Sequence, residues 1–301
     1  IVNTEVIFMT ATTSQNLITR IVNPSNQEFN QLRKQGKPFI IDGVSNNWNA
    51  YKNWSNEYLI NTCGNNRIQV ETYPKDYFEG YKYAKVLDNA YYTNMTFREY
   101  MDIVEGKQNN DCLYYLSQSN MRKYFPQLLE DITLLDFFKK EPRDIYLFFG
   151  FKNKKHTSSS PLHFDDVHNI FAQIRGKKRF LLFPPTNYLS FYPPLESDYS
   201  PTCSRVDADQ PNLELFPKFP LDKKIEVILN SGEILYLPPF WWHHVTALDE
   251  NISLAFWYPT SINDFWSQKG ILSTVFQVAP HVVPRIIRNH RGKRSLVPDS
   301  Q

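Results

Sequence analysis

The sequence predicts a mainly β protein with flanking helices. From Asp144 onward, short runs of β-branched and aromatic residues alternate with Gly, Pro, Asn and Ser, a pattern typical of an all-β sandwich or barrel. Aromatic residues make up 15% of the 301 residues, and 20 prolines outnumber 10 glycines, so the loops are expected to be stiff. With 42% hydrophobic residues, the chain can bury a substantial core as one large domain.

Several runs carry the β pattern. The first expected strand is the apolar run at residues 37–44, and the later ones are residues 145–151, 169–175, 178–183, 225–229, 234–237 and 252–258. Arg175-Gly176-Lys177 is expected to form a tight hairpin between two of these strands. The β pattern stops after Tyr258.

Helices are expected before the β-rich part. Residues 55–63 fit a helix that Ser55 caps and that Gly64 closes in the left-handed conformation. Residues 96–105 fit a second helix, which begins with a capping box at Thr96.

Three regions are expected along the chain: an N-terminal extension at residues 1–36, a catalytic domain at 37–260, and a helical segment with a basic tail at 261–301. Apolar residues at helical spacing in 263–283 could pack on the core or on a second subunit, which favours a homodimer. The dense basic cluster at 285–294 is either a solvated terminal segment or a contact for a nucleic acid or another acidic partner.

The net charge and the cysteine positions exclude some classes of protein. The net charge is +2, from 33 basic and 31 acidic residues, so the chain lacks the overall field of a dedicated nucleic-acid binder. Cys63, Cys112 and Cys203 lie far apart and form neither a disulfide framework nor zinc-ligand spacing. The sequence contains no apolar stretch long enough to span a membrane. We expect an intracellular, soluble protein in the cytoplasm or nucleus.

One pair of motifs indicates metal chemistry. In an extended chain, His163 and Asp165 of Ser160-Pro-Leu-His-Phe-Asp project to the same side and can reach one metal ion. A distant third ligand, His243 of Pro-Pro-Phe-Trp-Trp-His-His-Val, would complete two imidazoles and a carboxylate on one face of the ion. Such a facial triad suits an iron that must also hold a chelating co-substrate and dioxygen. A simple hydrogen-bonded His-x-Asp pair is the alternative.

These residues resemble the JmjC-domain family of 2-oxoglutarate oxygenases, specifically its small hydroxylase branch, in which an asparaginyl hydroxylase is nearest in pattern. The resemblance rests on Pro161-Leu-His-Phe-Asp, on Asn169-Ile-Phe-Ala-Gln-Ile-Arg-Gly-Lys-Lys-Arg-Phe-Leu-Leu-Phe-Pro-Pro, on Gly232-Glu-Ile-Leu-Tyr-Leu-Pro-Pro-Phe-Trp-Trp-His-His-Val and on Phe256-Trp-Tyr. Fainter agreement extends back to Lys37.

The resemblance implies a double-stranded β-helix, which is the jelly-roll core of cupin-like proteins. It implies an Fe(II)- and 2-oxoglutarate-dependent dioxygenase that uses O2 to hydroxylate an unactivated C–H bond, with a protein or peptide as substrate. The implied iron ligands are His163, Asp165 and His243, and the pattern favours His243 over His244 because the ligand directly follows Trp-Trp.

The resemblance also implies a binding site for 2-oxoglutarate. Lys178 aligns with a lysine that pairs with the distal carboxylate, and strand alternation puts Lys177 on the opposite face. Ser160 and Tyr115 align with hydroxyl groups that bind the same carboxylate, and Asn169 with an asparagine of this pocket. For Lys178 the alternative is a surface lysine in a turn; for Tyr115 it is core packing, because a slip of one residue would turn the preceding tyrosine inward.

One position departs from the family pattern: Ala255 stands where the asparaginyl hydroxylase has an asparagine, so a polar contact near the co-substrate is missing. The remaining histidines His156, His168 and His244 are expected on the surface or behind the ligands rather than on the metal. Asp166 is expected to point away from the metal, since it alternates with its neighbour.

Three classes of function therefore remain. The first is a hydroxylase of a protein side chain. The second is a demethylase or an RNA-modifying oxygenase of the same superfamily, for which the basic tail is the one favourable feature. The third is a non-catalytic cupin-like binding module, and the intact set of ligands together with Lys178 argues against it.

Overall fold

The structure is a computed structural model that describes residues 18–74, 91–108, 112–151, 157–194, 202–261, 264, 275–276 and 279–280. The expected helical segment at 263–283 falls almost entirely outside the described residues, and the basic tail at 285–294 lies wholly outside them.

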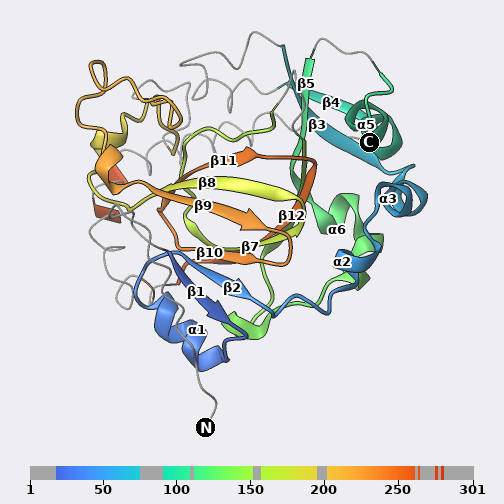
Figure 1. The fold of residues 1–301 in the computed structure, drawn as a ribbon, viewed down its shortest axis with the longest axis horizontal. Helices are drawn as coiled ribbons and strands as arrows, with labels where there is room; N and C mark the ends of the chain where they lie inside the picture. Colours follow the sequence, from blue (N-terminus) through green and yellow to red (C-terminus); the bar gives the residue numbers. More distant parts are fainter. Residues whose placement is uncertain are drawn as a thin grey trace, which may run out of the picture.

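Twelve strands and several short helices make up the described chain (Figure 1). The strands are β1 (Thr19–Val22), β2 (Phe39–Asp42), β3 (Arg67–Pro74), β4 (Tyr91–Thr96), β5 (Cys112–Asn120), β6 (Asp144–Gly150), β7 (Val167–Arg175), β8 (Lys177–Phe183), β9 (Ile225–Asn230), β10 (Ile234–Leu237), β11 (Trp242–Ala247) and β12 (Asn251–Pro259). The α-helices are α1 (Asn26–Arg33), α2 (Asn49–Asn53), α3 (Asn56–Cys63), α5 (Phe97–Val104) and α6 (Met121–Tyr124). The 3-10 helices are η2 (Pro126–Asp131), η3 (Asp136–Phe138), η4 (Tyr188–Phe191) and η5 (Leu221–Lys223).

The strands form two sheets. The large sheet has nine strands in the order β1-β2-β10-β7-β12-β6-β5-β3-β4, and the small sheet has three in the order β11-β8-β9. Strands that follow one another in sequence, such as β7 and β8, lie in different sheets. Figure 1 shows the small sheet beside the central strands of the large one, with α3 and α5 next to β3 and β4. This arrangement confirms the expected jelly-roll core.

The expected hairpin at Gly176 is wrong. Strand β7 pairs with β10 and β12, whereas β8 pairs with β9 and β11. The turn at Gly176 therefore carries the chain from one sheet to the other. The sequence marks this turn correctly, because Gly176 has a φ of +68°, but a tight turn does not by itself decide which strands pair.

The helix caps agree with the sequence except at one end. Ser55 accepts a hydrogen bond from a backbone N–H of α3, and Thr96 forms the expected capping box with α5. Gly64 has right-handed angles, φ −53° and ψ −30°, so the expected left-handed closure of α3 is wrong. Its N–H continues the helical pattern by donating to Ile60, and the chain turns only after it.

Two faces of the large sheet carry different hydrophobic clusters. In β12, Leu254 and Phe256 face the main core under the helices, while Ala255 and Trp257 face the small sheet. Strand β7 alternates in the same way: Ile170 belongs to the main core, and the next residue along the strand faces the small sheet. Strands buried on both faces explain the nearly continuous apolar runs, and alternation decides which residues reach the space between the sheets.

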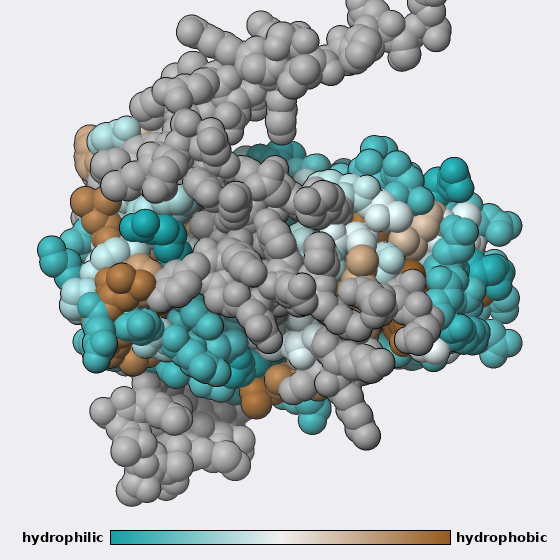
Figure 2. Space-filling model, turned by 90° about the horizontal axis from the view of Figure 1, so that it is seen from above, coloured by the Kyte–Doolittle hydropathy of each residue, from teal (hydrophilic) through white to brown (hydrophobic). Residues whose placement is uncertain are grey.

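On the face seen in Figure 2, the described residues are mainly hydrophilic, with hydrophobic side chains in separate spots. The exposed large hydrophobic residues include Leu213, Leu215 and Ile228. Among the described helices, none has the length and hydropathy needed to cross a bilayer. All three cysteines are free thiols, as the sequence predicted.

Gly176→Ala should destabilise the protein strongly, because a Cβ there would lie 2.3 Å from the carbonyl oxygen of Glu250. Gly106 is a matched control: it also has a positive φ, +71°, but nothing lies within 4 Å of an added Cβ. We expect Gly106→Ala to lower the free energy of unfolding by about 1–2 kcal/mol through backbone strain. Gly176→Ala should cost about 1–3 kcal/mol more through overpacking.

Denaturant unfolding followed by tryptophan fluorescence measures both variants. Equal losses at the two positions would contradict the close approach of the β7–β8 turn to the chain around Glu250.

Candidate active site

The segment that carries the His-x-Asp motif pairs with β11. Isolated antiparallel bridges join Ser159 to Thr246 and His163 to His243. In the second bridge the N–H of His163 donates to the carbonyl of His243 at 3.0 Å, and the N–H of His243 donates back at 2.7 Å. Residues that are 80 positions apart in the sequence are therefore directly opposite each other.

Both imidazole rings are oriented by the backbone. Nδ1 of His163 lies 2.8 Å from the carbonyl oxygen of Pro161, and Nδ1 of His243 lies 2.9 Å from that of Trp241. An Nδ1–H that donates to a carbonyl fixes the tautomer and leaves Nε2 as a lone-pair ligand. The two ring centroids are 4.1 Å apart.

Asp165 completes the group. Its backbone carbonyl accepts a hydrogen bond of 2.7 Å from the N–H of Phe240, which holds the motif beside the β10–β11 connection. Its Oδ2 lies 3.7 Å from Nε2 of His243. One ligand atom from each of His163, Asp165 and His243 lies within 4.8 Å of the others, so the structure brings the three predicted residues together.

The electrostatics of this group fit a bound cation. Burial raises the pKa of Asp165 above its usual value. Burial first, and then the neighbouring His163, lower the pKa of His243 well below its usual value. Both shifts reflect the cost of placing charges in a dry site, and a divalent cation would compensate it by favouring an ionised carboxylate and neutral imidazoles. The donor set, two imidazole nitrogens and one carboxylate, suits a ferrous ion.

The other candidate ligands point elsewhere, as expected. His244 faces away from the group, and its Nε2 lies 3.1 Å from Oδ2 of Asp209. His168 is fully buried rather than on the surface. In this buried position its ring contacts Tyr236 and Asp264. Asp166 is exposed and is not part of the group. His156 lies outside the described residues.

Lys178 is a buried cation with no acidic partner among the described residues. It is 1% exposed, whereas Lys177 is exposed, so the two lysines alternate as predicted. Its Nζ lies 3.4 Å from the hydroxyl of Tyr115 and 5.1 Å from the ring centroid of Phe148. Burial lowers the pKa of Lys178 to about 7. A carboxylate bound here would supply the missing counter-charge.

The remaining predicted residues line the same cavity, which measures about 300 Å³. Tyr115 rather than Tyr114 reaches it, since Tyr114 packs against the main core. Ser160 lines it with a hydroxyl that accepts a hydrogen bond of 3.1 Å from the N–H of Val245. The side-chain oxygen of Asn169 lines it without a hydrogen-bond partner. Ala255 packs in an apolar cluster instead, so it adds no polar contact.

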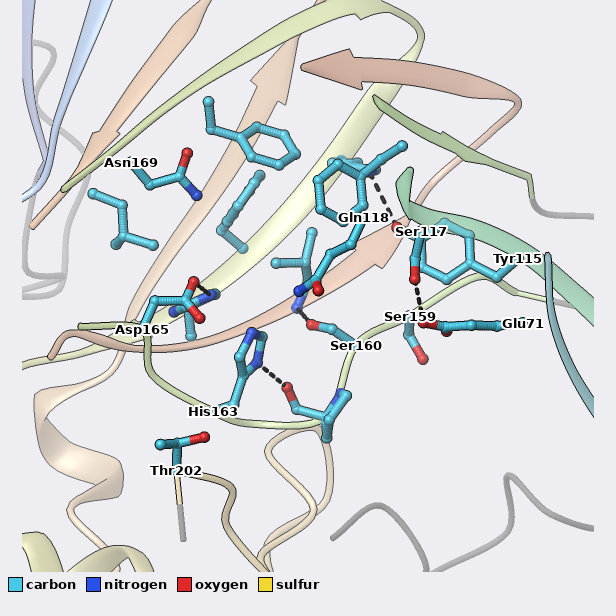
Figure 3. A pocket seen from close by; sticks show the side chains of 18 of the residues that line it. Glu71, Tyr115, Ser117, Gln118, Ser159, Ser160, His163, Asp165, Asn169 and Thr202 are labelled. Carbon is cyan, nitrogen blue, oxygen red and sulfur yellow. Dashed lines mark hydrogen bonds and ion pairs between the residues drawn. The ribbon is translucent and has the colours of Figure 1, made fainter. Parts of the chain in front are cut away.

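Sequence reasoning missed the opposite wall of the cavity. Glu71 and Tyr73 of β3, Tyr92 of β4, and Ser117 and Gln118 of β5 all line it. Figure 3 shows Glu71, Ser117 and Tyr115 on one side, and His163 with Asp165 on the other. None of the three strands was predicted, because their polar and aromatic residues form no run like those after Asp144.

Comparison with known proteins agrees with the fold. The profile of the family described as a cupin-like domain matches residues 25–264. This match covers most of the chain, and the chain therefore belongs to the cupin-like domain family.

Several relatives carry names that refer to the JmjC domain or to enzymatic activities. The chain is 32% identical to JmjC domain-containing protein D of Dictyostelium discoideum over 80% of this chain and 56% of that protein. It is 30% identical to lysine-specific demethylase 8 of Xenopus tropicalis over 81% of this chain and 53% of that protein. It is 28% identical to tRNA wybutosine-synthesizing protein 5 of Danio rerio over 71% of this chain and 64% of that protein. The chain thus spans little more than half the length of the Dictyostelium and Xenopus proteins.

His243→Ala should weaken metal binding strongly, whereas His244→Ala should leave it nearly intact. The first change removes a ligand atom, while the second removes a ring that faces Asp209. Because loss of an outer partner alone lowers metal affinity about 10–100-fold, we expect at least roughly a 100-fold loss for His243→Ala. Isothermal titration calorimetry with Mn(II) measures the metal affinity of both variants. If His244→Ala lost as much affinity as His243→Ala, the assignment of the third ligand would be wrong.

Proposed function

We propose that this chain is an Fe(II)- and 2-oxoglutarate-dependent oxygenase that hydroxylates an unactivated C–H bond of a protein side chain. One observation carries the proposal: His163, Asp165 and His243 converge on the cavity in which Lys178 lies buried without an acidic partner among the described residues. The cavity thus combines a metal-ligand set with a cation suited to a small dicarboxylate.

In this proposal the two imidazoles of His163 and His243 and the carboxylate of Asp165 would hold the iron. When bound, Fe(II) supplies the redox chemistry by which O2 and 2-oxoglutarate give succinate, CO2 and one oxygen atom for the substrate. Lys178 would pair with the distal carboxylate of 2-oxoglutarate, and the hydroxyls of Tyr115 and Ser160 would donate to the same group.

The remaining parts of the cavity wall would position the reactants. The amide of Asn169, whose oxygen has no partner, provides a further polar contact for the co-substrate. The rings of Phe148 and Phe171 lie close to the Lys178 ammonium and keep water away from it. Excluding water strengthens the attraction between Lys178 and a carboxylate.

Demethylation or RNA modification by the same chemistry is the second candidate. The names of two relatives, a lysine-specific demethylase and a tRNA wybutosine-synthesizing protein, favour it. Mass spectrometry of trapped substrates distinguishes the outcomes: hydroxylation adds one oxygen, demethylation removes a methyl group, and RNA modification alters a nucleoside. The non-catalytic binding module is the third candidate, and it predicts no release of succinate.

We further propose the division of the chain into residues 1–36, 37–260 and 261–301, with the last region as a homodimer contact. Strand β1 and helix α1 occupy part of the first region, and β1 pairs in parallel with β2. Light scattering of the full chain, and of a chain that ends at Tyr258, tests the proposed contact.

Lys178→Met should raise the KM for 2-oxoglutarate at least about tenfold, because the distal carboxylate would lose its buried counter-charge. Lys177→Met is the matched control. Because Lys177 is exposed, this variant should keep the wild-type KM for 2-oxoglutarate. Succinate release with Fe(II) and 2-oxoglutarate measures both, and His163→Ala should release none. Succinate release by His163→Ala at the wild-type rate would refute the proposed function.

A further inference from the structure

The strand that presents Tyr115 to the cavity is irregular directly after this residue. The pairing of β5 with β6 shifts register between Leu116, which lies opposite Phe149, and Ser119. Gln118 lies within this shift and has a φ of +41°. A bulge of this kind interrupts the ladder of backbone hydrogen bonds and bends the strand. The backbone at Tyr115 therefore needs a restraint beyond ordinary strand pairing.

A tyrosine of α5 provides such a restraint from the face of the sheet that points away from the cavity. The hydroxyl of Tyr100 donates to the carbonyl of Phe149 at 2.6 Å and accepts from the N–H of Leu116 at 3.2 Å. Tyr100 is completely buried, and its ring packs edge-on against that of Phe149 with centroids 5.9 Å apart. Burial raises the pKa of Tyr100, so its hydroxyl keeps the proton that it donates. This hydroxyl thus joins β5 to β6 just before the register shifts.

The two peptide groups that Tyr100 holds adjoin Tyr115 and Gly150. The N–H of Leu116 belongs to the peptide that follows Tyr115, and the carbonyl of Phe149 belongs to the peptide that precedes Gly150. The ring of Tyr115 lies close to Gly150, because a Cβ added at this glycine would be 3.2 Å from Cε2 of the ring. The hydroxyl of Tyr100 therefore fixes the backbone that carries the ring and the backbone against which the ring lies.

The placement of this ring decides where the Tyr115 hydroxyl lies in the cavity. Its oxygen is 3.4 Å from Nζ of Lys178, the buried cation. Because the hydroxyl is at the far end of the ring, a small rotation of the peptide after Tyr115 would move it away from Lys178. A group that binds a small ligand must keep its geometry to within about 0.5 Å.

We infer that Tyr100 is a positioning residue for the co-substrate. From the main core, its hydroxyl holds the Tyr115 ring against Gly150, so that the Tyr115 hydroxyl and Lys178 meet the same carboxylate of 2-oxoglutarate. This inference rests on the proposed function. Tyr100 belongs to the main core and is not among the residues that line the cavity, so its effect is indirect.

Calorimetric titration of 2-oxoglutarate into the full chain loaded with Mn(II) tests this inference. Tyr100→Phe keeps the ring and removes the hydroxyl, and we expect it to lower the affinity for 2-oxoglutarate about three- to tenfold, the range of one net hydrogen bond. The affinity for Mn(II) should stay at the wild-type value. A general loss of folding would lower both affinities, so a selective loss identifies positioning.

Tyr58→Phe is the matched control, and a double variant tests the route of the effect. The hydroxyl of Tyr58, on the neighbouring helix α3, donates to Asp131 at 2.8 Å and has no link to β5. This control should lower the melting temperature and keep the affinity for 2-oxoglutarate. Tyr115→Phe removes the hydroxyl through which Tyr100 acts. Adding Tyr100→Phe to it should therefore cause no further loss of affinity.

Gly150→Ala displaces the same ring from the other side and remains informative if Tyr100→Phe does not fold. The added Cβ would press on Cε2 of Tyr115. We expect a loss of affinity for 2-oxoglutarate of at least about threefold, with the affinity for Mn(II) unchanged.

The inference is overturned if folded Tyr100→Phe or Gly150→Ala binds 2-oxoglutarate as tightly as the wild type. It is also overturned if Tyr58→Phe loses as much affinity, or if the double variant loses more than Tyr115→Phe alone. Failure of the proposed function looks different, since the wild type itself would neither bind 2-oxoglutarate nor release succinate. That result would overturn both.

Discussion

The reciprocal backbone pairing of His163 with His243 is the contact on which the site depends. A one-residue change in this register would turn one imidazole to the other face of the strand. The pairing exists because residues 157–163 join the small sheet at the free edge of β11, where β8 occupies the other edge. The large sheet in turn positions the β10–β11 connection, whose Phe240 N–H fixes Asp165. The fold thus creates the ligand set from three distant parts of the chain.

The second constraint is charge in a confined space. Asp165, Glu71 and Lys178 all line a cavity of about 300 Å³, and burial shifts the pKa of each toward its neutral form. Interactions between charges gain strength in such surroundings, so the binding of each small charged ligand stabilises a group that is costly to leave alone. A metal ion and a dicarboxylate would neutralise two of these three groups, Asp165 and Lys178.

Much of the site could be predicted from sequence, because short-range alternation governs it. The spacing of His163 and Asp165 and the contrast between Lys177 and Lys178 follow from a period of two along a strand. The preference for His243 over His244 came instead from the family resemblance. The pairing of strands could not be predicted in this way. The turn at Gly176 was expected to form a hairpin, yet it connects two sheets, since tertiary packing rather than the turn selects the partners.

The cavity wall formed by β3, β4 and β5 was missed for a related reason. Glu71 lies in a strand of mixed polarity, and it gains significance only when β3 and β5 pair and place it beside Ser117. Helix α1 was missed although Ser25 and Glu28 form a capping box, because the helix buries only Phe29 and lacks an apolar stripe. Local sequence patterns predict where helices and strands end and which of their faces are buried. They do not predict a cavity wall that forms only when β3, β4 and β5 pair in the folded chain.

X-ray absorption spectroscopy of the Fe(II)-loaded protein, prepared without oxygen, tests the central claim most directly. The account predicts one iron per chain with only nitrogen and oxygen ligands, outer-shell scattering from two imidazoles, and a changed ligand shell after addition of 2-oxoglutarate. A sulfur ligand, fewer than two imidazoles, or a spectrum that 2-oxoglutarate leaves unchanged would contradict it.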